Sequence, residues 1–127
     1  IARRQRQMCI RDRFKIYRAV VLLENPVDIH KLRELEQYFK NIVVFQHTPL
    51  RVLRRKKDMM RKKRVFSIKV HQLAPNLLEV LIKCEGGLYV KELISGDDGR
   101  TSPSFSEFLG VQARCIELDV LYVHEYI

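Results

Sequence analysis

The sequence predicts an α+β fold with a mainly antiparallel sheet and a few short helices. Residues 66–70 and 78–84 alternate apolar and polar side chains on either side of a short turn, a pattern typical of an antiparallel hairpin. Elsewhere, strand and helix signals follow each other without the regular alternation of a parallel α/β fold. The chain has 127 residues, of which 46% are hydrophobic, so we expect one domain with its own core.

The first third of the chain predicts a strand, a helix and a second strand. Residues 14–23 are rich in β-branched and aromatic side chains on both alternating faces and end at Asn25-Pro26, which indicates a central strand. Asp28 is suited to be the N-cap of a helix. Its apolar positions follow helical spacing and are expected in the core: Ile29, Leu32, Leu35 and Phe39. Residues 42–45 predict a second short strand, which Thr48-Pro49 ends.

The last third predicts two short helices and a final strand. A turn at residues 74–76 closes the hairpin, and a Gly86-Gly87 corner leads into a helix over residues 89–94 that Gly96 ends. Ser104 and Glu107 form a capping box for a further helix, with Gly110 as its stop. In the final strand we expect three apolar side chains to point inward: Ile116, Leu118 and Val120. We expect the acidic side chains of Glu117 and Asp119 to point outward.

The positive charge is concentrated in one segment. The net charge is +9, and residues 51–64 hold nine basic residues against the single acidic Asp58. We call these nine residues the basic tract: Arg51, Arg54, Arg55, Lys56, Lys57, Arg61, Lys62, Lys63 and Arg64. Charges this dense repel one another unless a polyanion neutralises them. From composition alone, the tract therefore indicates contact with a nucleic acid such as RNA and a solvated loop or edge strand equally. We expect an extended excursion that touches the core at residues 52–53 and 59–60.

Residues 86–103 form the most informative segment, because glycines, an aromatic, a lysine and two carboxylates meet at one strand-to-helix corner. Paired glycines allow positive φ or a close approach of another group. Tyr89 and Lys91 would start the helix and line two walls of one pocket. From spacing alone, an ordinary helix-surface lysine is the commoner interpretation of Lys91, and Tyr89 is equally a core residue that holds the helix.

The chain resembles the archaeal and eukaryotic tRNA pseudouridine synthases that modify the TΨC arm, most closely the archaeal branch. Three segments carry the resemblance: Gln46-His47-Thr48-Pro49-Leu50-Arg51-Val52, the stretch GGLYVKELISGDDGRT from Gly86, and Pro103-Ser104-Phe105-Ser106-Glu107-Phe108-Leu109-Gly110. Order and spacing match from about Phe14 to the C-terminus. The resemblance implies isomerisation of uridine in the TΨC loop, at position 54, position 55 or both, without cofactor or metal.

The resemblance also implies roles for particular residues. The glycine-x-tyrosine-x-basic motif of the superfamily falls on Gly87, Tyr89 and Lys91. Lys91 would keep a catalytic aspartate ionised, since a neighbouring cation opposes the effect of burial on a carboxyl group. Tyr89 would stack on the base. Leu109 would be the aliphatic residue against the active site. Apart from the resemblance, Arg100 would bind phosphate or pair with Asp97, and such a pair is the commoner arrangement in soluble proteins.

Two parts of the family pattern are missing from these 127 residues: the Gly-Arg-x-Asp type loop with the catalytic aspartate, and an N-terminal RNA-binding region. We therefore interpret residues 14–127 as the C-terminal part of a catalytic domain that is inactive alone. Residues 1–13 look like one translated frame of a sequencing adapter, with a genuine basic arm that binds nucleic acid as the alternative.

Two other functions compete with the isomerase. The first is a basic RNA-binding module without catalysis. The second is a nuclease in which Glu92, Asp97 and Asp98 bind Mg²⁺, although their spacing matches no metal motif. For the isomerase we expect tRNA as the partner, a monomer, a cytoplasmic location, no membrane contact, no metal and no cofactor.

Overall fold

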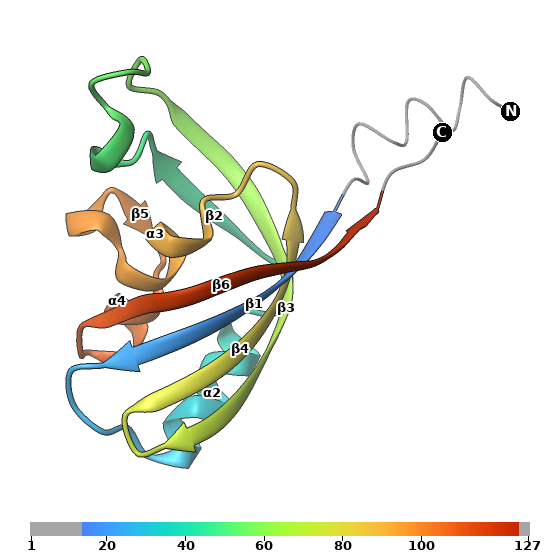
Figure 1. Cartoon of the computed structure of the whole chain (residues 1–127), viewed down its shortest axis with the longest axis vertical. Coiled ribbons are helices and arrows are strands. Elements are labelled where there is room, and N and C mark those ends of the chain that lie inside the picture. Colours follow the sequence, from blue (N-terminus) through green and yellow to red (C-terminus); the bar gives the residue numbers. More distant parts are fainter. Residues whose placement is uncertain (1–13, 125–127) are drawn as a thin grey trace, which may run out of the picture.

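The computed structural model describes residues 14–124, so the prediction for residues 1–13 lies outside the described residues. Figure 1 shows a sheet with helices packed against one of its faces. The six strands have the order β5-β2-β3-β4-β1-β6, and every pairing is antiparallel. The elements in chain order are β1 (Phe14–Leu23), α2 (Ile29–Tyr38), β2 (Ile42–His47), η1 (Leu50–Val52), β3 (Met60–Ala74), β4 (Leu77–Glu85), α3 (Val90–Ser95), η2 (Asp97–Gly99), β5 (Thr101–Ser102), α4 (Phe105–Leu109) and β6 (Ala113–His124). The predicted α+β class is confirmed.

The core lies between the sheet and the three α-helices. Alternate residues of β1 face the helices and are buried, because side chains in a strand point to opposite faces in turn: Tyr17, Ala19, Val21 and Leu23. Helices α2, α3 and α4 contribute Leu32, Leu35, Leu93, Ile94 and Phe105 to the same cluster. The prediction that β1 is central is confirmed, since it pairs with both β4 and β6. Ile29 is 41% exposed, because it lies in the first turn of α2, and its expected place in the core is wrong.

Strand β6 departs from simple alternation. Its pairing with β1 shifts register twice, once between Val20 and Val21, where Ile116 is the extra residue. Ile116 and Val120 are exposed, and only Leu118 packs partly against the core, so the expected inward triplet is wrong for two of its members. The outward acidic pair of this strand is confirmed.

That acidic pair belongs to an ion-pair network on the face of the sheet without helices. Arg18 on β1 contacts Glu79 at 2.6 Å, Glu117 at 3.0 Å and Asp119 at 3.1 Å. Hydrogen bonding, first to Glu79 and then to Glu117, raises the pKa of Arg18. The network therefore links β4, β1 and β6 across the open face.

The basic tract is more regular than the sequence predicts. Its start forms η1, and residues 60–64 belong to β3, where they pair with β2. Val52 is buried as expected, but Met59 and Met60 are about half exposed, so the expected contact of residues 59–60 with the core is wrong. The dense charge hides the strand signal, because strands usually favour β-branched and aromatic residues.

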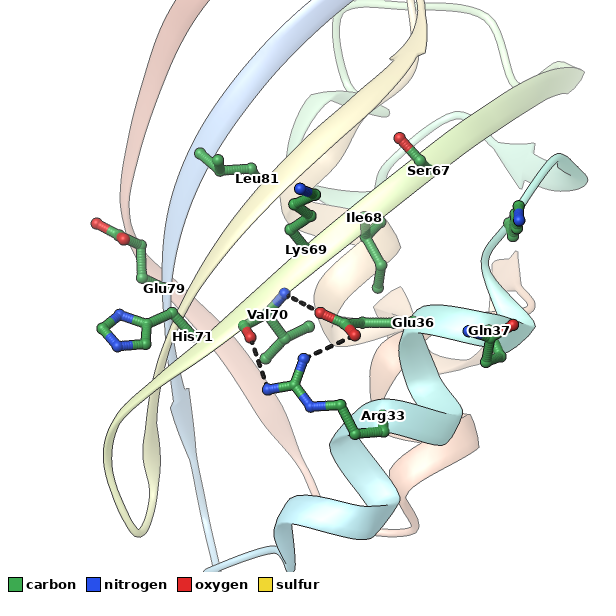
Figure 2. Close-up of a pocket in the computed structure, with 11 residues that line it drawn as sticks. Arg33, Glu36, Gln37, Ser67, Ile68, Lys69, Val70, His71, Glu79 and Leu81 are labelled. Carbon is green, nitrogen blue, oxygen red and sulfur yellow. Dashed lines mark hydrogen bonds and ion pairs between the residues drawn. The ribbon is translucent and has the colours of Figure 1, made fainter.

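Helix α2 covers the part of β3 that β2 does not reach (Figure 2). The Val70 N–H donates to Glu36 Oε2 at 2.6 Å, and Arg33 Nη2 donates to the Val70 carbonyl at 3.1 Å. Arg33 and Glu36 also pair with each other at 2.7 Å. The pocket beside this contact is lined by residues of α2, β3 and β4 together with Lys40, none of which is a predicted site residue.

Across residues 14–124, no helix combines the length and the apolar character that a bilayer crossing requires.

Candidate functional site

The corner between β4 and α3 brings the predicted motif to the helix-covered side of the sheet. Gly87 has φ +91°, a conformation that favours glycine, and Tyr89 is the N-cap residue of α3. A Cβ atom on Gly87 would lie only 3.1 Å from Lys63 Nζ on β3. Glycine is therefore suited to this position both by its backbone angle and by the close approach of a lysine side chain.

Gln46 on β2 fixes the main chain of Tyr89. Its side chain is fully buried; Nε2 donates to the Tyr89 carbonyl at 2.9 Å, and the Tyr89 N–H donates to Oε1 at 2.9 Å. Nε2 also lies 3.4 Å from Thr101 Oγ1. Sequence reasoning quoted Gln46 only as part of the resemblance. One sequence signal could have identified Gln46 as a buried polar residue: it follows Val44 by two positions, so it lies on the inward face of an apolar strand.

The Tyr89 ring lies among guanidinium groups. The Arg61 Cζ atom is 5.6 Å and the Arg51 Cζ atom 5.9 Å from its centroid, within the range of cation–π contacts. Tyr89 remains half-buried, so part of its surface is open. A base that stacks on this ring would lie beside these guanidinium groups or displace one of them.

Glu92 binds Arg51 beside the same corner. It is only 6% exposed and accepts two hydrogen bonds from Arg51, from Nε at 2.9 Å and from Nη2 at 3.3 Å. Hydrogen bonding to Glu92 raises the pKa of Arg51. The Asp97 carboxylate accepts from the Leu50 N–H at 3.0 Å. Glu92 and Asp97, two of the three carboxylates of the nuclease hypothesis, thus have different partners.

Lys91 lies on α3, which packs against β6, and its side chain is exposed. Burial raises the pKa of Cys115 on β6, and the positive charge of Lys91 lowers it in part. That Tyr89 and Lys91 line two walls of one pocket stays a prediction.

Two other predicted substrate contacts have structural partners. Arg100 donates to the Thr48 carbonyl from Nε at 3.2 Å and from Nη2 at 3.0 Å, and pairs with Asp58 at 2.7 Å. Its expected alternative partner, Asp97, is instead bonded to the main chain of η1. Leu109 is buried in the core at the end of α4.

The structure divides the rest of the basic tract into three groups. The loop between η1 and β3 exposes four residues: Arg54, Arg55, Lys56 and Lys57. In β3, Arg61 and Lys63 point to the helix-covered face, opposite Gln46 and Val44. Lys62 and Arg64 point to the other face.

Tyr17 is a polar residue of the helix-covered face that sequence reasoning assigned only to a strand. Burial and, to a smaller degree, the Cys84 thiol raise its pKa, so its hydroxyl is neutral at physiological pH.

Comparisons with known proteins agree with these observations. The family model described as Pus10, C-terminal, matches residues 3–124. A tRNA pseudouridine synthase Pus10 from Ignisphaera aggregans is 55% identical over 92% of this chain and 27% of its own length. The corresponding protein from Methanocaldococcus jannaschii is 45% identical over 87% of this chain and 24% of its own length. The chain thus spans about a quarter of the length of these curated relatives.

Solved structures show the same fold. A Cbf5-Nop10-Gar1 complex contains a chain with a TM-score of 0.68 and 24% identity, over 87% of this chain and 30% of that chain. An H/ACA RNP bound to a substrate RNA containing 2′-deoxyuridine gives a TM-score of 0.59 and 21% identity, over 86% of this chain and 28% of that chain. At these identities the likeness concerns the fold.

Proposed function

This chain belongs to the Pus10 C-terminal family, and from that membership we propose that it is the C-terminal part of a catalytic domain that isomerises uridine to pseudouridine in tRNA. The substrate would be uridine 54, uridine 55 or both in the TΨC loop. The observation that carries the proposal is the Gly87-Tyr89-Lys91 corner, whose main chain Gln46 holds from β2.

The chemistry requires few groups. The bond between N1 of uracil and C1′ of the ribose breaks, the base rotates, and a bond forms between C5 and C1′; the proton leaves C5 and N1 gains one. A carboxylate must stay ionised in a dry pocket, which a nearby cation favours. Lys91 supplies that cation at an exposed position where a further segment of a longer protein can meet it. The aspartate itself would come from outside these 127 residues.

Tyr89 and Gly87 would hold the flipped nucleotide, and the exposed loop residues 54–57 would contact the tRNA backbone. Arg100 would act indirectly, because its ion pair with Asp58 fixes the loop between η1 and β3. We place the protein with its tRNA substrate in the cytoplasm and expect a monomer. The alternative is a basic RNA-binding module without catalysis, which the four exposed cations of that loop favour.

A chimera tests the proposal. Residues 14–127 replace the matching segment of the full-length Ignisphaera aggregans relative, and pseudouridine formation is measured on tRNA transcripts. We expect turnover, and we expect Lys91→Ala to abolish it while tRNA affinity changes less than about twofold, because one exposed cation contributes little to binding. Lys31→Ala, at an exposed lysine of α2, is the matched control.

Equal turnover of the Lys91→Ala chimera would remove this lysine from the site. A chimera that binds tRNA but forms no pseudouridine, beside an active relative, would favour the RNA-binding module.

A further inference from the structure

We propose that Arg61 and Lys63 form a binding site for one phosphodiester group beside Tyr89, and that the adjacent Lys62 and Arg64 lie outside it. The inference rests on the proposed function, which identifies the ligand as the RNA phosphate next to the target uridine. It divides a tract that the sequence presents as uniform into residues that position the substrate and residues that do not.

The register of β3 against β2 separates these four residues. Arg61 lies opposite Gln46 and Lys63 opposite Val44, and both partners are fully buried on the helix-covered face. Directly paired residues of antiparallel strands point to the same face. Lys62 lies opposite Phe45, which is 42% exposed on the other face.

Arg61 and Lys63 converge on the motif corner. The Arg61 Cζ atom lies 5.6 Å from the centroid of the Tyr89 ring, and Lys63 Nζ lies 3.1 Å from the place that a Cβ atom on Gly87 would occupy. Both side chains are half-buried. A guanidinium and an ammonium group beside an open aromatic ring match the charge and the flat base of a nucleotide.

The Nε–H group of Arg61 has no hydrogen-bond acceptor among the described residues. Its Nε atom is buried and is the one buried side-chain donor or acceptor without a hydrogen bond among residues 14–124. A buried donor without an acceptor is unfavourable, so an oxyanion at this position would stabilise it. Arg51, the other arginine beside Tyr89, differs because Glu92 already neutralises it.

Lys62 and Arg64 have other contacts. Arg64 Nη1 donates to Asn41 Oδ1 at 3.1 Å, and Lys62 Nζ lies 5.9 Å from the Phe45 ring. These contacts hold both side chains on the face without helices, away from Tyr89. They therefore provide matched controls of the same charge in the same strand.

The test is an NMR titration of the ¹⁵N-labelled 127-residue chain with a five-nucleotide oligouridylate. The arginine Nε–H resonance of Arg61, assigned with Arg61→Lys, reports directly on the unpartnered donor. We expect a saturable shift of this resonance and of the Gly87 amide, with no shift of the Arg64 Nε–H. A neutral methylphosphonate analogue of the same length should leave the Arg61 resonance unmoved.

Matched substitutions complete the test. Lys63→Gln should weaken oligouridylate binding by about fivefold or more, because it removes a charge-assisted contact, whereas Lys62→Gln should change it less than about twofold. An unmoved Arg61 Nε–H, an equal response to the methylphosphonate, or equal losses for the two substitutions would overturn the inference. None of these readouts requires turnover, so the chimera can be active when this inference fails, and the reverse.

Discussion

The contact between Gln46 and Tyr89 predicts a large loss of stability for Gln46→Leu, a substitution of similar volume without hydrogen-bonding groups. The change leaves the Tyr89 N–H without the acceptor that now lies at 2.9 Å, whereas the Tyr89 carbonyl loses the Gln46 donor but keeps the Leu93 N–H at 3.0 Å. A main-chain group left unpaired in the interior costs about 1–3 kcal/mol, and burial of the more apolar leucine offsets part of this. We expect the free energy of unfolding to fall by about 2 kcal/mol, out of a total of about 5–15 kcal/mol for a typical domain.

Urea unfolding followed by circular dichroism measures this difference, and the melting temperature should fall by about 8 °C for a domain of this size. The control is Gln37→Leu, the same chemical change at an exposed glutamine of α2, which should alter stability by less than about 0.5 kcal/mol. If the two substitutions cost the same, Gln46 does not hold the corner, and the position of Tyr89 must have another cause.

Three further predictions concern the residues around the corner and the core. Glu92→Gln should lower the free energy of unfolding by about 1 kcal/mol in urea, because its ion pair is buried on one side only, whereas Glu34→Gln, in an exposed pair at 3.7 Å, should cost less than about 0.3 kcal/mol. Gly87→Ala and Gly99→Ala both strain a positive φ, at about 1–2 kcal/mol, but only the first meets another side chain and should cost about 0.5–1 kcal/mol more; equal losses would contradict that contact. Burial raises the pKa of Cys84 from 9.0 to about 12. The unfolded state therefore loses the thiol proton first, and stability falls as pH rises through this window, by up to about 1.4 kcal/mol per pH unit. Urea unfolding at pH 8 and pH 10.5 should show a smaller decrease for Cys84→Ala than for the unaltered chain.

Local signals predict most of the fold. The hairpin of β3 and β4, the end of α3 at Gly96 and the capping box of α4 depend on neighbouring residues, and the structure contains each of them. The Ser104 hydroxyl accepts from the Glu107 N–H at 3.1 Å, as the capping box requires. Features that depend on the exact register between distant strands are not predicted. The exposure of Ile116 follows from its register against β1, which no local pattern contains.

The candidate site shows the same division. The motif at Gly87, Tyr89 and Lys91 can be found from the resemblance, because its members lie within five residues of each other. The residues that contact this motif cannot be found in the same way. Gln46 and Arg61 lie on strands far away in the sequence and reach Tyr89 only after the sheet has formed. The packing of α3, which carries Lys91, against β6 likewise depends on residues far apart in the sequence.

The ion pair between Arg33 and Glu36 has a consequence for self-association. Hydrogen-bonding groups at an exposed strand edge can act as a template for a strand from another molecule. Because two helical side chains already occupy the N–H and carbonyl of Val70, an incoming strand would have to break a charged contact before it could pair there. One arginine and one glutamate on a helix thus take the hydrogen-bonding place of a neighbouring strand, and in this way they oppose the strand-by-strand growth of fibres.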